Sequence, residues 1–161
     1  MSNYIRPHIP GATVFFTLAL AQRGSDLLVT KVEALRHAVR VTKAERPFRI
    51  EAWVVLPDHM HFVWTLPEND ADFSTRIGAI KARFSMGLEA RNQRTSHILR
   101  REKGIWQRRF YEHHIRNAAE YQAYVRYCWI NPVKHGLVQR PEDWPFTSYN
   151  RTKHGDAFAP P

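Results

Sequence analysis

Two histidines, His59 and His61, are separated by one residue in a segment that has the pattern of a β-strand. Side chains alternate between the two faces of a strand, so both imidazoles lie on one face with their α-carbons roughly 7 Å apart. Side chains at that separation can converge on one ion, and neutral imidazole is a common ligand of first-row transition metals. By itself the pair is more typical of two half-exposed histidines on the open side of a sheet. It therefore needs support from other residues.

A second candidate lies on a helix predicted from residue 117 to about residue 131. At 3.6 residues per turn, Tyr127 lies about a quarter turn from the buried stripe of this helix, and Asn131 shares its face. A phenol with its ordinary pKa of about 10 is a weak nucleophile at neutral pH. A metal beside it would make a phosphorus atom more electrophilic, and the Asn131 oxygen could serve as a third ligand. The alternative is that Tyr127 packs at a helix end that Asn131 caps.

The elements that position these residues follow from hydrophobic periodicity and turn signals. Strands are predicted at residues 13–20, 48–56, 59–66 and 106–115. Helices are predicted from Thr30, with Glu33 completing a capping box, at residues 73–84, and from Asn117 to a stop at Pro132. The first six elements match the ferredoxin-like plan. We expect an α+β, ferredoxin-like (RRM-like) antiparallel sheet with helices on one face, plus a C-terminal helix that carries Tyr127.

The composition predicts one globular domain, and its charge leaves two interpretations open: a protein with a polyanionic partner, or a basic protein with no specific partner. The 161 residues suffice for a single domain, which we place at residues 1–149, followed by a flexible tail at residues 150–161. The net charge of +9 favours phosphates, because binding them releases condensed counterions. The single cysteine, Cys128, excludes an internal disulfide. No apolar run approaches the ~20 residues of a membrane span, and no signal peptide is evident, so we expect a cytoplasmic protein that joins the nucleoid when bound to DNA.

Several cations and one aromatic residue are candidates for contacts with nucleic acid. Residues 91–104 have weak periodicity and are predicted to form a mobile basic loop. Trp53 is predicted to point away from the apolar set of the strand at residues 48–56, where it could stack on a base. The candidate phosphate contacts are Arg91, Arg94, Arg100, Arg101, Lys103, Arg108 and Arg109.

Taken in order along the chain, these residues resemble a known family. The sequence PDHMHFV at residues 57–63 resembles the His-hydrophobic-His motif of HUH endonucleases. Three further segments resemble the REP-associated tyrosine transposases: WQRRFYEH at residues 106–113, NPVKHGLV at residues 131–138 after Tyr127, and DWPF at residues 143–146. The resemblance extends from about Tyr4 to Tyr149, and the combination is far more specific than the histidine pair.

The resemblance implies a role for each residue of the candidate site. His59 and His61 would bind Mg²⁺ or Mn²⁺, and Tyr127 would be the nucleophile. Asn131 stands where relatives place a polar third ligand, often glutamine. The implied reaction cleaves and rejoins single-stranded DNA near hairpin-forming REP palindromes, through a 5′-phosphotyrosine and a free 3′-OH. We expect a monomer, with a dimer as the alternative.

Two other functions stay open from the sequence. A four-stranded sheet with exposed aromatic residues also describes a non-catalytic module that binds single-stranded nucleic acid, although the aromatic-glycine signature of RNA-recognition domains is missing. A metal-dependent nuclease that uses water would leave Tyr127 incidental and would form no covalent adduct. No third ligand at the spacing usual for zinc is found.

Overall fold

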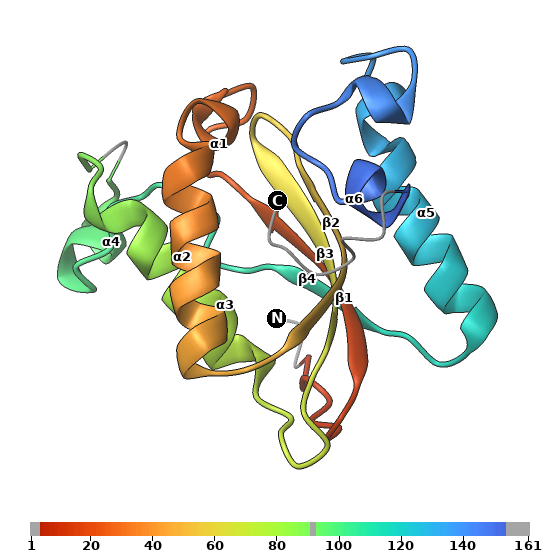
Figure 1. Ribbon diagram of the computed structural model, residues 1–161. Coiled ribbons are helices and arrows are strands. Elements are labelled where there is room, and N and C mark those ends of the chain that lie inside the picture. Colours follow the sequence, from red (N-terminus) through yellow and green to blue (C-terminus); the bar gives the residue numbers. More distant parts are fainter. Residues whose placement is uncertain (1–3, 91–92, 154–161) are drawn as a thin grey trace.

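A four-stranded antiparallel sheet lies between two layers of helices in the computed structural model, which describes residues 4–90 and 93–153 (Figure 1). The strands are β1 (Thr13–Ala19), β2 (Arg49–Val55), β3 (His59–Thr65) and β4 (Tyr111–His114). Their order across the sheet is β2-β3-β1-β4. Strands β1 and β2, which an intervening helix connects, are thus separated by β3, as in the split β-α-β plan. The predicted ferredoxin-like α+β fold is confirmed.

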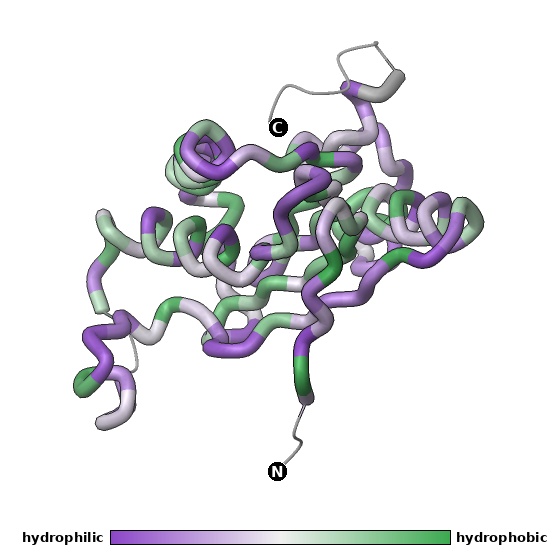
Figure 2. Tube along the Cα trace, turned by 90° about the horizontal axis from the view of Figure 1, so that it is seen from below, coloured by the Kyte–Doolittle hydropathy of each residue, from purple (hydrophilic) through white to green (hydrophobic). Residues whose placement is uncertain are grey.

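Helices cover both faces of this sheet (Figure 1). On one face lie α1 (Leu27–Thr30), α2 (Val32–Glu45) and α3 (Phe73–Met86). On the other face lies α5 (Ala118–Lys134), with η1 (Pro141–Asp143) and α6 (Tyr149–Lys153) after it. A further short helix, α4 (Thr95–Leu99), forms within the segment predicted to be a loop and stands away from the rest in both views (Figures 1 and 2). None of the helices in the described residues is long and apolar enough to cross a membrane.

The alternation predicted for β3 is confirmed, and it separates two hydrophobic clusters. Met60, Phe62 and Trp64 belong to the larger cluster, between the sheet and the α2–α3 layer. Val63 belongs to the smaller cluster on the opposite face, under α5. Because side chains alternate along a strand, His59 and His61 also face α5.

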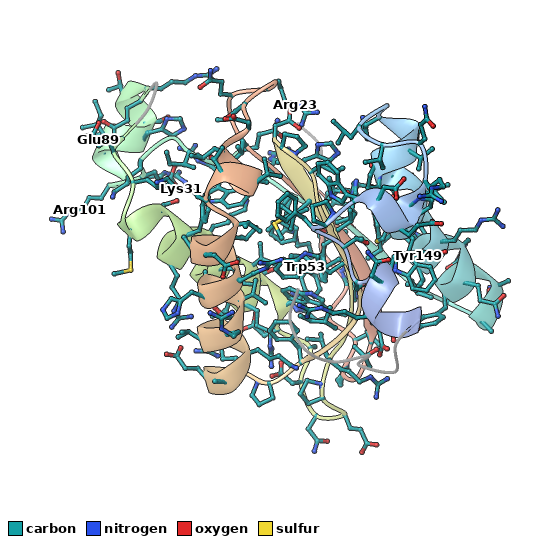
Figure 3. The ribbon with its side chains drawn as sticks, turned by 45° about the horizontal axis from the view of Figure 1, so that its top comes forward. Arg23, Lys31, Trp53, Glu89, Arg101 and Tyr149 are labelled. Carbon is teal, nitrogen blue, oxygen red and sulfur yellow. The ribbon has the colours of Figure 1, made fainter. Side chains whose placement is uncertain are left out.

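The prediction that Trp53 is available for stacking is wrong. A register shift between Ile50 and Ala52 inserts an extra residue into β2 and reverses the facing of everything after it. Trp53 is therefore turned into the larger cluster, where it is 0% exposed and packs edge-to-face on Phe62 (Figure 3). Ala52 and Val54 instead face α5.

Two predicted helix boundaries differ from the structure. The expected capping box of Thr30 and Glu33 does not form, because Thr30 ends α1 and its hydroxyl donates to Leu27 O at 3.2 Å. The residue before α2 is Lys31, which provides no side-chain cap. Helix α5 does not stop at Pro132, since the backbone N–H of His135 still donates to Asn131 O at 3.0 Å across the proline.

The start of α5 agrees with the sequence prediction, whereas the fourth strand and the C-terminal segment differ from it. The predicted cap at Asn117 is confirmed, because its side chain accepts from Glu120 N at 2.9 Å. The fourth strand is shorter than predicted, and only an isolated bridge between Leu20 and Trp106 precedes it. Residues 150–153 of the predicted tail belong to α6, and residues 154–161 lie outside the described residues.

Candidate active site

Each of the two imidazoles on β3 is oriented through its Nδ1 atom. His59 Nδ1 lies 2.7 Å from Asp58 Oδ1, and His61 Nδ1 lies 2.9 Å from the Thr17 hydroxyl oxygen. Asp58 is itself fixed, because the backbone N–H of Gly24 donates to its Oδ2 at 2.8 Å. Metal-binding histidines are commonly held in this way through the nitrogen that does not bind the metal. The Nε2 atoms are therefore the ones available to a ligand.

Burial keeps both rings in the neutral form that binds metals. It lowers the pKa of His61 to about 3, positive charge on His59 and His135 adds to this effect, and an interaction with Asn131 opposes it. Burial also lowers the pKa of His59, against the opposing hydrogen bond and charge of Asp58. Neutral imidazole has a lone pair free for coordination.

Helix α5 brings Tyr127 next to the histidines. The centre of its half-buried ring lies 5.2 Å from that of His61 and 5.8 Å from that of Phe15, both in edge-to-face contact. The Nζ atom of Lys134, two turns further along α5, lies 5.0 Å from the centre of the same ring. The phenol is thus held between a candidate metal ligand and a cation.

Asn131 is 0% exposed and has one free acceptor. Its Nδ2 donates to Tyr127 O at 3.3 Å, whereas its Oδ1 has no hydrogen-bond partner among the described residues. His61 Nε2 is also buried without a hydrogen-bond partner there, and Asn131 raises the pKa of His61 against the effect of burial. Buried acceptors are rarely left unpaired. A divalent cation between them would satisfy both.

The donor set is therefore mixed. Within the described residues, no group of three His, Cys, Asp or Glu side chains is placed to hold a metal. Two imidazole nitrogens and one amide oxygen fit a divalent ion such as Mn²⁺ better than a structural zinc site, which takes four Cys or His ligands.

His135 also belongs to this site, although the sequence analysis did not include it. Its exposed ring lies after the last turn of α5, with its centre 5.0 Å from that of His59. The sequence did contain a signal for His135, because residues 127, 131 and 135 are spaced four apart and share one helix face. The orienting role of Thr17 had no such signal, since only strand pairing brings Thr17 opposite His61.

Comparison with known proteins agrees with this geometry. The family model for IS200-like transposases matches residues 19–128, a stretch that includes both histidines and Tyr127. The chain is 49% identical over 151 residues to the REP-associated tyrosine transposase of Escherichia coli (strain K12), covering 94% of this chain and 84% of that protein. This chain belongs to the REP-associated tyrosine transposases. It is therefore an enzyme of the transposase class.

Two further relatives of the transposase span nearly its whole length. A Haemophilus influenzae protein assigned to the same group is 40% identical over 160 residues, covering 98% of this chain and 91% of that protein. A solved structure of a REP-associated tyrosine transposase bound to a REP hairpin has a TM-score of 0.84 at 46% identity, covering 99% of this chain and 89% of that chain.

The cations predicted to contact DNA lie away from the candidate site on the opposite face of the sheet. Helix α4 and its flanks project beside α2 and α3, whereas α5 covers the opposite face (Figure 1). Of the predicted contacts in this region, Arg101 points outward at the edge of the molecule (Figure 3). Arg94, Arg100 and Arg109 are also exposed, and Arg91 lies outside the described residues.

Two other predicted phosphate contacts have partners within the protein. The Nζ atom of Lys103 donates to the backbone oxygens of Ser85, Met86 and Leu88 at 2.9, 3.0 and 2.5 Å, so it ties its own loop to the end of α3. Arg108 forms an ion pair with Glu102 at 3.0 Å. Because this ion pair is exposed, Arg108 can exchange Glu102 for a phosphate at little cost in free energy.

Proposed function

We propose that this transposase is a metal-dependent endonuclease and strand transferase that acts on single-stranded DNA at hairpin-forming, REP-like elements. The observation that carries the proposal is the pair of buried acceptors without partners among the described residues, His61 Nε2 and Asn131 Oδ1, beside Tyr127. The solved relative that is bound to a REP hairpin supports a hairpin as the DNA partner.

The metal would be held by His59, His61 and Asn131. Bound there, Mg²⁺ or Mn²⁺ would withdraw electron density from the scissile phosphate and neutralise charge on its oxygens. Two imidazole ligands favour Mn²⁺ over Mg²⁺, which prefers oxygen donors.

The side chains of the site then orient the nucleophile, which is the Tyr127 hydroxyl. Edge-to-face contacts with Phe15 and His61 hold the Tyr127 ring in one orientation. The Tyr127 oxygen attacks phosphorus, a new P–O bond forms to the phenol, and the bond to the 3′-oxygen breaks. The phenol proton passes to solvent, and the departing 3′-oxygen takes up a proton. The products are a 5′-phosphotyrosine and a free 3′-OH, so a second 3′-OH can reverse the step without an external energy source.

The proposed active unit is a monomer. Tyr127 lies 5.2 Å, ring centre to ring centre, from the His61 of its own chain, so one chain can supply both nucleophile and metal ligands. The net charge of +9 supports binding of a DNA strand by a single copy.

The test is incubation with hairpin-forming single-stranded DNA in Mn²⁺, Mg²⁺ or chelator, followed by a denaturing gel. We expect a metal-dependent covalent protein–DNA band that Tyr127→Phe abolishes while DNA binding persists. Tyr124→Phe is the matched control, because Tyr124 lies one turn earlier on α5 and contacts the same Phe15 ring at 4.6 Å. It should retain the band.

Each alternative has its own signature in this assay. Cleavage without a covalent band would indicate a nuclease that uses water. Binding without cleavage across a panel of hairpins would indicate a non-catalytic binding module. An unchanged band in Tyr127→Phe would refute the assigned nucleophile.

A further inference from the structure

Lys134, in the last turn of α5, extends back to the candidate nucleophile. Lys134 and Tyr127 are seven positions apart, which is nearly two full helical turns, so both side chains leave the same face of α5. The Nζ atom of Lys134 lies 5.0 Å from the centre of the Tyr127 ring. The lysine is exposed and the tyrosine is half-buried, so a ligand that approaches the phenol from solvent also meets the ammonium group.

The Lys134 ammonium group is without a hydrogen-bond partner or counter-ion among the described residues. By contrast, the ammonium groups of Lys81 and Lys103 donate to backbone oxygens. A lysine in the last turn of a helix commonly interacts with the free carbonyl groups there. Lys134 bonds to no carbonyl group of the described residues, and its Nζ atom lies beside the ring of a residue two turns earlier. Stabilisation of the helix end therefore does not explain its position.

The charge of Lys134 works against the metal site as long as no anion is bound there. Burial is the main cause of the low pKa of His61, and the charge of Lys134 is one of the smaller causes in the same direction. A field that disfavours a proton on His61 also disfavours a metal cation on that ring. The carboxylate of Asp58 is already hydrogen-bonded to His59 and to the backbone of Gly24. An anion between Lys134 and the metal would remove the repulsion.

A phosphodiester has the charge and the acceptors that this arrangement needs. Its two non-bridging oxygens share one negative charge, so one oxygen can bind a metal while the other accepts a hydrogen bond. An ammonium group has three donors, and hydrogen bonds between charged groups are about twice as strong as neutral ones. A phosphorus atom attacked by Tyr127 becomes bonded to the phenol oxygen, which belongs to the ring that Lys134 already contacts. Lys134 is therefore close to the phosphate at the moment of attack.

We propose that Lys134 binds a non-bridging oxygen of the scissile phosphate as Tyr127 attacks it, and that it keeps this contact in the phosphotyrosine. The inference rests on the proposed function, because it takes Tyr127 as the nucleophile. Lys134 forms no covalent bond in this role. It neutralises charge on the phosphate oxygens during the attack, when a preorganised cation lowers the barrier most. Lys134 is thus a catalytic residue additional to Tyr127 and to the candidate metal ligands.

The first test removes the charge of Lys134 and keeps the rest of the side chain. Methionine is unbranched and similar in length, so Lys134→Met keeps an apolar contact with the Tyr127 ring. At saturating hairpin DNA and Mn²⁺, the rate of covalent band formation should fall about 5- to 30-fold, because hydrogen bonds to charged groups are strong and solvent weakens exposed ones. Lys134→Arg should restore most of the rate, since a guanidinium group also binds phosphate.

The matched control is Arg126→Ala. Arg126 is an exposed cation next to Tyr127 in the sequence, but its side chain leaves α5 about 100° away from that of Tyr127. Its removal lowers the net charge by the same amount as Lys134→Met and should leave the rate of covalent band formation unchanged.

Two binding measurements separate this role from a structural one. Without DNA, Lys134→Met should bind Mn²⁺ at least as tightly as the wild-type protein in titration calorimetry, because the substitution removes a repelling charge. Its hairpin affinity, from fluorescence anisotropy, should change less than about threefold, since Lys134 is one of 24 lysine and arginine residues. A residue that only shaped the site would weaken metal binding and activity together.

Chemical rescue tests whether the positive charge itself is needed. Lys134→Cys places a thiol at an exposed position, and alkylation by 2-bromoethylamine, with loss of bromide, gives a side chain that ends in an ammonium group at nearly the length of lysine. The native thiol, Cys128, is 0% exposed, and burial raises its pKa, so it should not react. This treatment should restore most of the lost rate. Iodoacetamide adds a neutral group to the same variant and should restore none.

Three outcomes would overturn the inference. These are a wild-type rate of covalent band formation in Lys134→Met, Mn²⁺ binding by Lys134→Met that is weaker by about tenfold or more, or equal rescue by iodoacetamide and 2-bromoethylamine. A covalent band that survives Lys134→Met at the wild-type rate would leave the proposed function intact. Failure of the wild-type protein to form the band with any hairpin would refute the proposed function itself, and the role of Lys134 with it.

Discussion

Replacement of Asn131 by leucine should separate stability from function. Asn131 is fully buried, with its Oδ1 unpaired among the described residues and its Nδ2 bonded to Tyr127 O at 3.3 Å. A buried acceptor without a partner costs about 1–3 kcal/mol, and an ordinary hydrogen bond contributes about 0.5–1.5 kcal/mol. Leucine has a similar shape and removes both. In chelator, we therefore expect the free energy of unfolding to change by between about −0.5 and +2.5 kcal/mol.

Added metal should stabilise the wild-type protein more than Asn131→Leu. At a concentration 100 times its dissociation constant, a metal that binds only the folded state stabilises it by about 2.7 kcal/mol. If the loss of the Asn131 oxygen weakens binding about 100-fold, the gain at the same concentration falls to about 0.4 kcal/mol. For a chain of this size, 1 kcal/mol corresponds to about 2–4 °C in the thermal midpoint. The two proteins should therefore respond to Mn²⁺ by clearly different amounts.

Scanning calorimetry in chelator and in Mn²⁺ measures the stability of each protein without metal and the increase in its thermal midpoint with metal. Asn131→Gln is the matched control, because it keeps an amide oxygen and should keep a metal-dependent shift. Asn131→Leu should also lose the covalent DNA band. The reasoning fails if Asn131→Leu is destabilised by more than about 1 kcal/mol in chelator while its response to Mn²⁺ equals that of the wild-type protein.

Three further predictions concern the same site. In chelator, the free energy of unfolding should fall as the pH drops from about 6.5 towards 3, because the unfolded chain takes up a proton that the folded His61, with its pKa of about 3, does not. His61 should contribute up to ~1.4 kcal/mol per pH unit to this fall, so urea unfolding of His61→Gln should show a shallower pH dependence. Thr17→Val removes the hydroxyl that orients His61 and should weaken Mn²⁺ binding about 10- to 100-fold by titration calorimetry, with secondary structure unchanged. A mixture of His61→Ala and Tyr127→Phe proteins should form no covalent band if the proposed monomer is the active unit, because Tyr127 and His61 lie together in one chain. Restored activity would show that subunits share the site.

Local sequence pattern determined much of this protein. The alternation of apolar residues in β3 placed His59 and His61 on one face, because the period of a strand is fixed by backbone geometry. Helical spacing likewise put Tyr127 and Asn131 on one face of α5. The order of the elements was enough to predict the ferredoxin-like sheet, and the motifs were enough to predict the family, as the fold and the relatives confirm.

The tertiary structure decided what depends on neighbours distant in the chain. Trp53 is buried because an extra residue in β2 reverses its facing, and the register of a bulge is set by pairing with β3. Alternation had predicted a base-stacking role for it.

The environment of the site is likewise a product of the fold. Thr17 meets His61 only because β1 pairs with β3, and His61 loses basicity only because α5 closes over it. Spacing along the chain could place Tyr127 and Asn131 on one helix face and the two histidines on one strand face. Whether those faces meet, and whether they are dry, follows from long-range packing, which no local pattern encodes.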